Sequence, residues 1–178
     1  VDGGVVEPKP VRPGGPVLYA GGESEAGKAL IARTCDAWLT HGDPPEVLGP
    51  KFREMDRRRD ATGLAPLAYG VAADAVVRDT EAEARAEVAR ITDVRASAQG
   101  YANYRDFVEH SRLERAVSIQ DYSVSNRGLR TGLVGTAEQV AERILELEAL
   151  GVDLVLLQCS PQREEMRRIA EEVIPLVK

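Results

Sequence analysis

The residues from Pro16 to Ala32 have the types and spacing of a phosphate-binding turn. The apolar run Val17–Tyr19 predicts a short strand, and Gly21 and Gly22 predict a tight turn after it. Ser24 stands where the N-cap of a helix is expected. Because the first N–H groups of a helix lack partners and its dipole is positive at that end, such a turn can bind a phosphate. The same residues would also form an ordinary strand-to-helix turn without a ligand, and the pattern leaves both interpretations open.

The composition is that of a globular chain with an acidic balance. Its 178 residues are 43% hydrophobic, which is enough for a sizeable core in one domain. A formal net charge of −6 argues against nucleic-acid binding, which needs a basic surface. No apolar run reaches the roughly 18 residues of a membrane helix, and the first residues do not resemble a signal peptide. Cys35 and Cys159 lack the spacing of a metal site, so we expect packed thiols, no metal and a cytoplasmic location.

Strand-to-helix units recur along the chain. Strand-like runs cover 36–40, 67–77 and 152–158, and a helical stretch follows each of them. The last run is almost continuously apolar, which is typical of a strand buried on both faces of a parallel sheet. Ser160 is expected to cap the final helix. Three residue pairs have the spacing of a capping box, namely Asp43 with Glu46, Thr80 with Glu83, and Thr136 with Gln139.

The alternation of strands and helices predicts parallel βαβ units in an α/β fold. The helices begin at the C-terminal ends of the strands, which is the face where barrel enzymes bind their ligands. A closed barrel and a doubly wound open sheet both fit this pattern. The segment 92–131 departs from it, because aromatic, acidic and basic residues are interleaved there. We interpret 92–131 as a lid or insertion, since long connections in compact domains are usually functional or disordered.

A set of segments spread over the chain carries a family resemblance: PVLYAGGESEAGKALIA, DAWLTHGDPPE, YGVAADAVVRDTEAEA, TGLVGTAEQVAERILELEALGVDLVLLQCSPQREEM and EEVIPLV. Together they resemble the C-terminal half of the bacterial-luciferase-like flavin monooxygenases. ITDVRASAQGYANYRDF and DYSVSNRGLRTGLVG resemble the dimethyl sulfone monooxygenases within that family, which are cousins of the alkanesulfonate monooxygenases. The resemblance covers nearly the whole chain, and its motifs are specific in combination although each is weak alone.

The resemblance implies a (β/α)8 TIM barrel that uses reduced FMN and O2. Such a barrel normally has about 250 residues, and this chain matches from about the fifth strand onward. We therefore expect the C-terminal half of the barrel, about four βα units in a single domain over 1–178, with 92–131 inserted. Barrel strands one to four, with their flavin and active-site contacts, are expected to be missing. An open half-barrel would expose an apolar strand edge, so a homo-oligomer is expected.

The resemblance also assigns the cofactor site. It places the FMN phosphate on the turn formed by Ala20, Gly21, Gly22, Glu23 and Ser24. The hydroxyl of Ser24 and the nearby backbone N–H groups would donate to the phosphate. Glu23 would contribute through its backbone alone, because its carboxylate repels an anion.

Residues near the ends of the next two strands have counterparts in the family's substrate site. His41 would line the pocket or act as an acid or base, although a histidine hydrogen-bonded within a loop fits as well. Ala72 stands where the sulfonate enzymes carry an arginine, and this loss of a cation suits a neutral sulfone better than an anionic sulfonate. Asp74 stands in the place of a histidine, and it is either a catalytic residue or a buried structural carboxylate.

The segment Asn126–Arg130 matches a mobile loop that carries an active-site arginine in the family. Asn126 and Arg130 are assigned to the lid and substrate site, and Arg127 to catalysis. Either arginine could close over the flavin and exclude water. An exposed surface arginine is the alternative, and the alignment leaves the register open by one residue.

The reaction implied is the oxidation of dimethyl sulfone to methanesulfinate and formaldehyde, with cleavage of a C–S bond. FMNH2 would be the cofactor, supplied by a separate NAD(P)H-dependent flavin reductase, and a small organosulfur compound would be the substrate. Nucleic acid and membrane are not expected as partners. The alternatives are an alkanesulfonate monooxygenase, a deazaflavin-dependent oxidoreductase of the same superfamily, and a half-barrel without catalysis.

Overall fold

A four-stranded parallel sheet lies at the centre of the computed structural model, which describes residues 3–5, 7–93, 97–110, 117–119, 122 and 128–178. Its strand order is β1-β2-β3-β6, and a two-stranded parallel sheet pairs β4 with β5. The strands are β1 (Tyr19–Gly21), β2 (Ala37–His41), β3 (Ala68–Asp74), β4 (Val76–Val77), β5 (Val134–Gly135) and β6 (Leu154–Gln158). Each strand pairing in the described ranges is parallel, which confirms the βαβ prediction.

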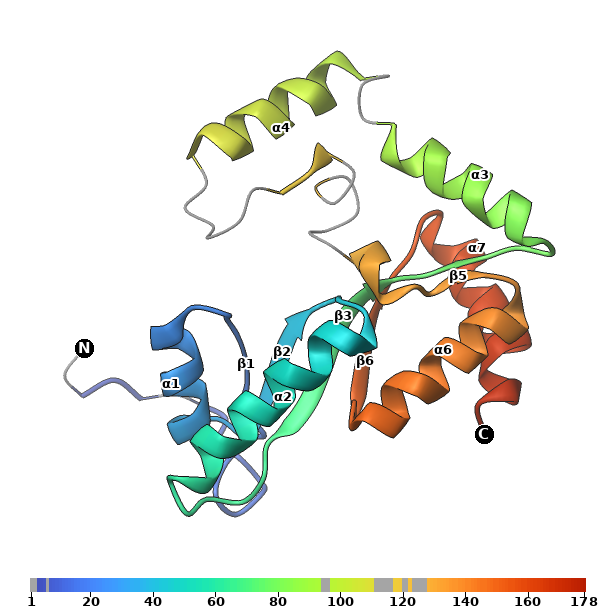
Figure 1. Ribbon diagram of the computed structural model, residues 1–178. Helices are drawn as coiled ribbons and strands as arrows, with labels where there is room; N and C mark the ends of the chain where they lie inside the picture. The colour runs from blue at the N-terminus through green and yellow to red at the C-terminus, as the bar shows by residue number, and fades with distance from the viewer. Residues whose placement is uncertain (1–2, 6, 94–96, 111–116, 120–121, 123–127) are drawn as a thin grey trace.

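Helices follow the strands in the expected alternation. They are α1 (Glu25–Thr34), α2 (Pro45–Asp60), α3 (Glu81–Thr92), α4 (Ala98–His110), α6 (Ala137–Leu150) and α7 (Gln162–Arg168). Shorter helical turns are η2 (Gly128–Thr131), the π-helical η3 (Ile169–Val173) and η4 (Ile174–Leu176). The chain from α3 to α6 separates the neighbouring strands β3 and β6, and Figure 1 shows α4 standing away from the sheet.

The core lies on one face of the sheet. An aromatic cluster joins β2, α2 and β3, because the Phe52 and Tyr69 rings stack with centroids 4.2 Å apart and the Trp38 ring meets both edge-on. Met55 and Leu147, from α2 and α6, are completely buried in the same core. Because these side chains are buried between the sheet and the helices, the helices pack on this face of β2 and β3. The alternate residues of both strands therefore point to the other face.

That other face carries exposed apolar residues. Tyr19 on β1 and Leu154 and Leu156 on β6 are 39–50% exposed. The prediction that the run 152–158 is buried on both faces is therefore wrong, since the helices of the described ranges leave Leu154 and Leu156 exposed. The apolar composition of 152–158 predicted a strand correctly, but it carries no information on what packs against the second face of that strand.

Two of the three predicted capping boxes are confirmed. The side chains of Thr80 and Thr136 each accept a hydrogen bond from the backbone N–H three residues later. The side chains of Glu83 and Gln139 in turn accept one from the backbone N–H of the cap residue. The prediction of a capping box at Asp43 and Glu46 is wrong. Pro44 is the N-cap of α2 and Pro45 its first residue, so the helix begins one residue too late for Asp43 to cap it.

The cap predicted for the last helix is also wrong. Pro161, rather than Ser160, occupies the N-cap of α7, and no side chain caps that helix. The cap predicted at Ser24 is confirmed, since its Oγ accepts a hydrogen bond from the Gly27 N–H at 3.1 Å. Across the described ranges, no helix is long and apolar enough to span a membrane. The cytoplasmic location stays a prediction.

The segment 92–131 is described in part. It holds α4 and η2, and the Tyr122 ring packs against Tyr104 and Phe107 of α4. Asn126 and Arg127 lie outside the described residues. The lid role of the segment stays a prediction.

Candidate functional site

The turn between β1 and α1 is built around Gly22 and Ser24. Gly22 has φ +149°, a backbone conformation that a residue with a side chain rarely adopts. The indole N–H of Trp38 donates to the Gly22 carbonyl at 3.0 Å and so fixes the turn to β2. Ser24 Oγ accepts from Gly27, which leaves its own O–H to donate. The N–H groups of Glu25 and Ala26 have no acceptor within the helix.

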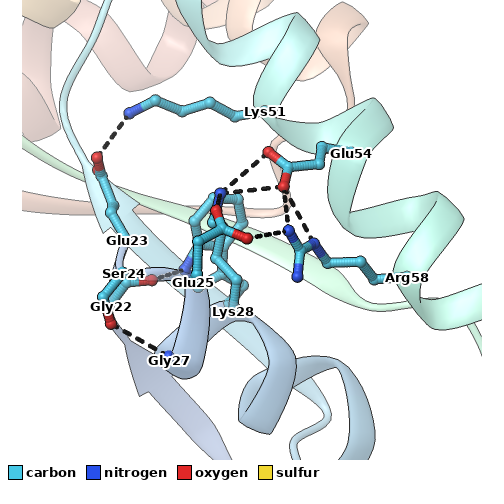
Figure 2. A network of polar contacts seen from close by, with 10 residues as sticks. Gly22, Glu23, Ser24, Glu25, Gly27, Lys28, Lys51, Glu54 and Arg58 are labelled. Atoms are coloured by element: carbon cyan, nitrogen blue, oxygen red, sulfur yellow. Dashed lines mark hydrogen bonds and ion pairs between the residues drawn. The ribbon is translucent and has the colours of Figure 1, made fainter.

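Each acidic side chain beside this turn is paired with cations. Glu25 contacts Lys28 and Arg58, and Glu54 of α2 joins the same two cations, with Lys28 Nζ at 3.0 Å from its Oε1 (Figure 2). The bond from Lys28, followed by that from Arg58, lowers the pKa of both carboxyl groups. The network therefore neutralises the acidic charge at the start of α1 and clamps α1 to α2.

The Glu23 side chain turns away from the helix end. Its Oε1 accepts from the Thr40 hydroxyl at 2.7 Å. Its Oε2 lies 3.0 Å from Lys51 Nζ, as Figure 2 shows. Lys51 also contacts Asp43 Oδ2 at 2.8 Å. The Ser24 hydroxyl and the first N–H groups of α1 are thus available as donors beside acids that are paired with cations, and helix starts of this kind can bind a phosphate group.

Asp74 ends β3 on the face opposite the aromatic cluster. Its side chain is 7% exposed, and its Oδ2 has no hydrogen-bond partner within the described part of the chain. Burial raises its pKa from 3.8 to about 6. η2 packs against β3 here, and a Cβ on Gly128 would collide with the Asp74 carboxylate. A glycine is thus needed at 128 for η2 to cover Asp74.

His41 and Ala72 occupy the same face as Asp74. They are register partners on β2 and β3, and Asp74 follows Ala72 by two residues. His41 is half-buried. The structure therefore brings two predicted site residues, His41 and Asp74, to the C-terminal edge of adjacent strands, with a small side chain between them.

Arg130 approaches the same edge from η2. Its guanidinium lies 3.3 Å from Asp43 Oδ1, and its side chain is 40% exposed. The predicted phosphate turn follows β1, His41 and Asp74 end β2 and β3, and Arg130 reaches the same edge from η2 through Asp43. Among the described residues, no group of three His, Cys, Asp or Glu side chains could hold a metal ion.

Sequence reasoning missed three residues of this region, Thr40, Lys51 and Gly128. Lys51 gave no local signal, because its partners lie 28 and 8 positions away. The Pro44–Pro45 pair was the available signal for Asp43, since a proline at the first helical position is favoured and moves the cap forward by one residue.

Comparisons with known proteins place this chain in a family. The model of the luciferase-like monooxygenases matches residues 1–154, and the chain belongs to this family. It is 33% identical over 190 aligned residues to an FMNH2-dependent dimethylsulfone monooxygenase of Pseudomonas fluorescens (strain Pf0-1). A protein of the same name from Pseudomonas putida is 31% identical over 181 residues. Each alignment covers 97% of this chain and 49% of the relative, so the chain spans about half the length of these curated relatives.

A solved structure shows the same fold. The crystal structure of a riboflavin lyase, with modified FMN and riboflavin, matches with a TM-score of 0.69 and 23% identity. The match covers 92% of this chain and 43% of that one. The expected α/β fold, part of a (β/α)8 barrel, is confirmed.

Proposed function

We propose that this chain supplies the flavin-phosphate site of an FMNH2- and O2-dependent monooxygenase. The observation that carries the proposal is the Ser24-capped start of α1 behind the positive-φ Gly22, at the C-terminal end of β1. The donors present suit a phosphate, namely the Ser24 hydroxyl and the N–H groups of Glu25 and Ala26. The carboxylates of Glu23 and Glu25 suit it as well, since both are ion-paired away from the turn.

The substrate that we propose is dimethyl sulfone or a close neutral relative. Two relatives at 33% and 31% identity carry the name dimethylsulfone monooxygenase. The face beside His41 and Asp74 carries Ala72, which adds no cation for a sulfonate. The overall reaction joins dimethyl sulfone, O2 and FMNH2 to give methanesulfinate, formaldehyde, FMN and water, in which one C–S bond breaks and one oxygen atom enters formaldehyde.

The residues of this chain would position the reactants and move protons. Bound reduced FMN supplies the electrons that activate O2. Asp74, whose pKa burial raises to about 6, would hold or release a proton at its carboxyl group, and His41 at the end of the adjacent strand is the second candidate acid or base. Arg127 and Arg130, with Asn126, would cover the site and exclude water as part of a lid over 92–131.

Two partners belong to the proposal. An NAD(P)H-dependent flavin reductase would supply FMNH2. A second copy of the chain is expected at the open edge of β1, which is an end strand of the four-stranded sheet, because an open strand edge favours association. Light scattering on the purified chain tests the second copy directly, since a monomer at all concentrations would contradict it.

The reaction is tested with the purified chain, a flavin reductase, NADH, FMN and dimethyl sulfone in air. We expect formaldehyde and methanesulfinate in equal amounts, and neither product without FMN. Sulfite released from an alkanesulfonate would instead assign the chain to the sulfonate enzymes. Hydride transfer to a deazaflavin without O2 would assign the chain to the deazaflavin-dependent oxidoreductases of the same superfamily. A folded chain that makes no product would contradict the activity proposed for this polypeptide.

A further inference from the structure

Four charged residues from four segments meet at the C-terminal edge of the sheet. Glu23 follows β1, Asp43 follows β2, Lys51 lies in α2 and Arg130 in η2. Lys51 Nζ contacts Glu23 Oε2 at 3.0 Å and Asp43 Oδ2 at 2.8 Å, and Arg130 contacts Asp43 Oδ1 at 3.3 Å. Lys51 is the centre of this group, because its ammonium group contacts one carboxylate in each of two loops.

The burial of these residues shows what Lys51 does for its partners. The Asp43 side chain is 2% exposed, while those of Lys51 and Glu23 are 23% and 26% exposed. Two carboxylates that share one ammonium group lie close together, and without that cation they would repel each other. A buried carboxylate that loses a cation also loses much of the compensation for its lost hydration. Lys51 therefore offsets the repulsion between the two loops, and the contact of Arg130 with Asp43 adds to this compensation.

Both loops lead to residues of the proposed flavin site. Glu23 stands between Gly22 and Ser24, so a force on its carboxylate acts on the turn that would hold the phosphate. Asp43 contacts Arg130 of η2, close to the end of the segment 92–131. The ammonium group of Lys51 is already engaged by two carboxylates, which makes it unsuited to bind the phosphate itself.

We infer that Lys51 is a positioning residue of the flavin site, which holds the phosphate turn through Glu23 and η2 through Asp43 and Arg130. This inference rests on the proposed function, because it assigns a role within that same site. Through Lys51, helix α2 would control the geometry of the turn after β1.

The chain offers a closely matched control. Arg78 is also a cation between two carboxylates from other elements, with Nη1 2.6 Å from Glu165 Oε2 and Nη2 3.3 Å from Glu87 Oε1. Its side chain is 20% exposed and that of Glu165 is 1% exposed, which is close to the burial of Lys51 and Asp43. Arg78→Met thus removes a comparable ion-pair bridge without touching the phosphate turn.

The test compares FMN with riboflavin, which lacks the phosphate, and measures both dissociation constants by quenching of flavin fluorescence. We expect Lys51→Met to weaken FMN binding about tenfold and to leave riboflavin binding within about twofold, because Arg130 still pairs with Asp43 while the phosphate turn loses the cation that holds Glu23. Lys51→Arg should restore FMN binding, because it keeps the cation. Arg78→Met should keep the FMN preference of the natural sequence, even where it lowers stability.

The outcomes separate this inference from the proposed function. A Lys51→Met chain that keeps the natural FMN preference, while Ser24→Ala loses it, overturns the role of Lys51 and leaves the proposed function standing. Equal loss of FMN and riboflavin binding in Lys51→Met would indicate general destabilisation and also overturns the inference. A natural chain that shows no preference for FMN over riboflavin overturns the proposed phosphate site itself.

Discussion

Replacing Asp74 by Asn should make the protein more stable at neutral pH and should change how its stability depends on pH. Asp74 is 7% exposed, and its Oδ2 accepts no hydrogen bond within the described part of the chain. Burial of an uncompensated carboxylate raises its pKa from 3.8 to about 6. Asn keeps the size of the side chain but carries no charge, so the cost of burying the charge disappears.

The sign and the size of the effect follow from proton linkage. The unfolded chain ionises Asp74 near pH 3.8 and the folded protein near pH 6. The folded state therefore binds more protons between these values, and stability falls as the pH rises through this window. Ionisation above pH 6 costs the folded protein about 3 kcal/mol relative to the protonated form.

The measurement is urea unfolding of both proteins from about pH 4 to about pH 8. The free energy of unfolding of Asp74→Asn minus that of the natural sequence should rise by about 2 kcal/mol between pH 4 and pH 7 and then stay constant. An unsatisfied amide on Asn adds a constant offset that does not alter this rise. Asp79→Asn, at a side chain that is 77% exposed, is the control for a surface charge.

A difference that is constant with pH would refute the reasoning, because it would mean that folding leaves the ionisation of Asp74 unchanged. A difference that falls with pH would mean that the folded protein stabilises the carboxylate. The nearby thiol of Cys159 does not disturb this range, since burial, followed by the charges of Glu165 and Asp74, raises its pKa further above 9.

Three further substitutions test the packing and capping on which the site depends, each by urea unfolding at neutral pH. Gly128→Ala should cost about 1–3 kcal/mol, because its Cβ would collide with Asp74, and a neutral effect would mean that η2 does not lie against β3. Thr136→Ala removes the cap of α6 and should cost about 1 kcal/mol, whereas no loss would argue against the capping box. Met55→Ala should cost about 2–5 kcal/mol because Met55 is completely buried, and a cost under 1 kcal/mol would contradict that burial.

The sequence was sufficient to predict the features that depend on neighbouring residues. The caps at Ser24, Thr80 and Thr136 each need one side chain and an N–H three residues later, so spacing alone identifies them. The strands near 37–41 and 68–74 followed from apolar runs between turn residues. The turn after β1 was predicted from two glycines and a serine.

The remainder depends on contacts between distant parts of the chain. Gly128 lies 54 positions after Asp74, and only the folded chain shows that the two are packed together. Lys51 joins Glu23 to Asp43 across two loops, and no local pattern predicts such a bridge. Asp43 had the right spacing for a cap, but a second proline delayed the helix and left its carboxylate to an ion pair. The exposure of Leu156 depends on which elements cover β6.

The measurement that tests the central claim most directly is an anaerobic titration of the chain with reduced FMN, followed by the fluorescence of Trp38. Its indole N–H donates to the Gly22 carbonyl, so the fluorophore contacts the proposed phosphate turn. Thr136→Ala is the matched control for Ser24→Ala, because both remove a helix cap and only Ser24 lies in the turn. We expect saturable binding that Ser24→Ala weakens and Thr136→Ala does not. A folded chain that does not bind reduced FMN, or binds it equally well without the Ser24 hydroxyl, would contradict the assignment of this turn as the flavin-phosphate site.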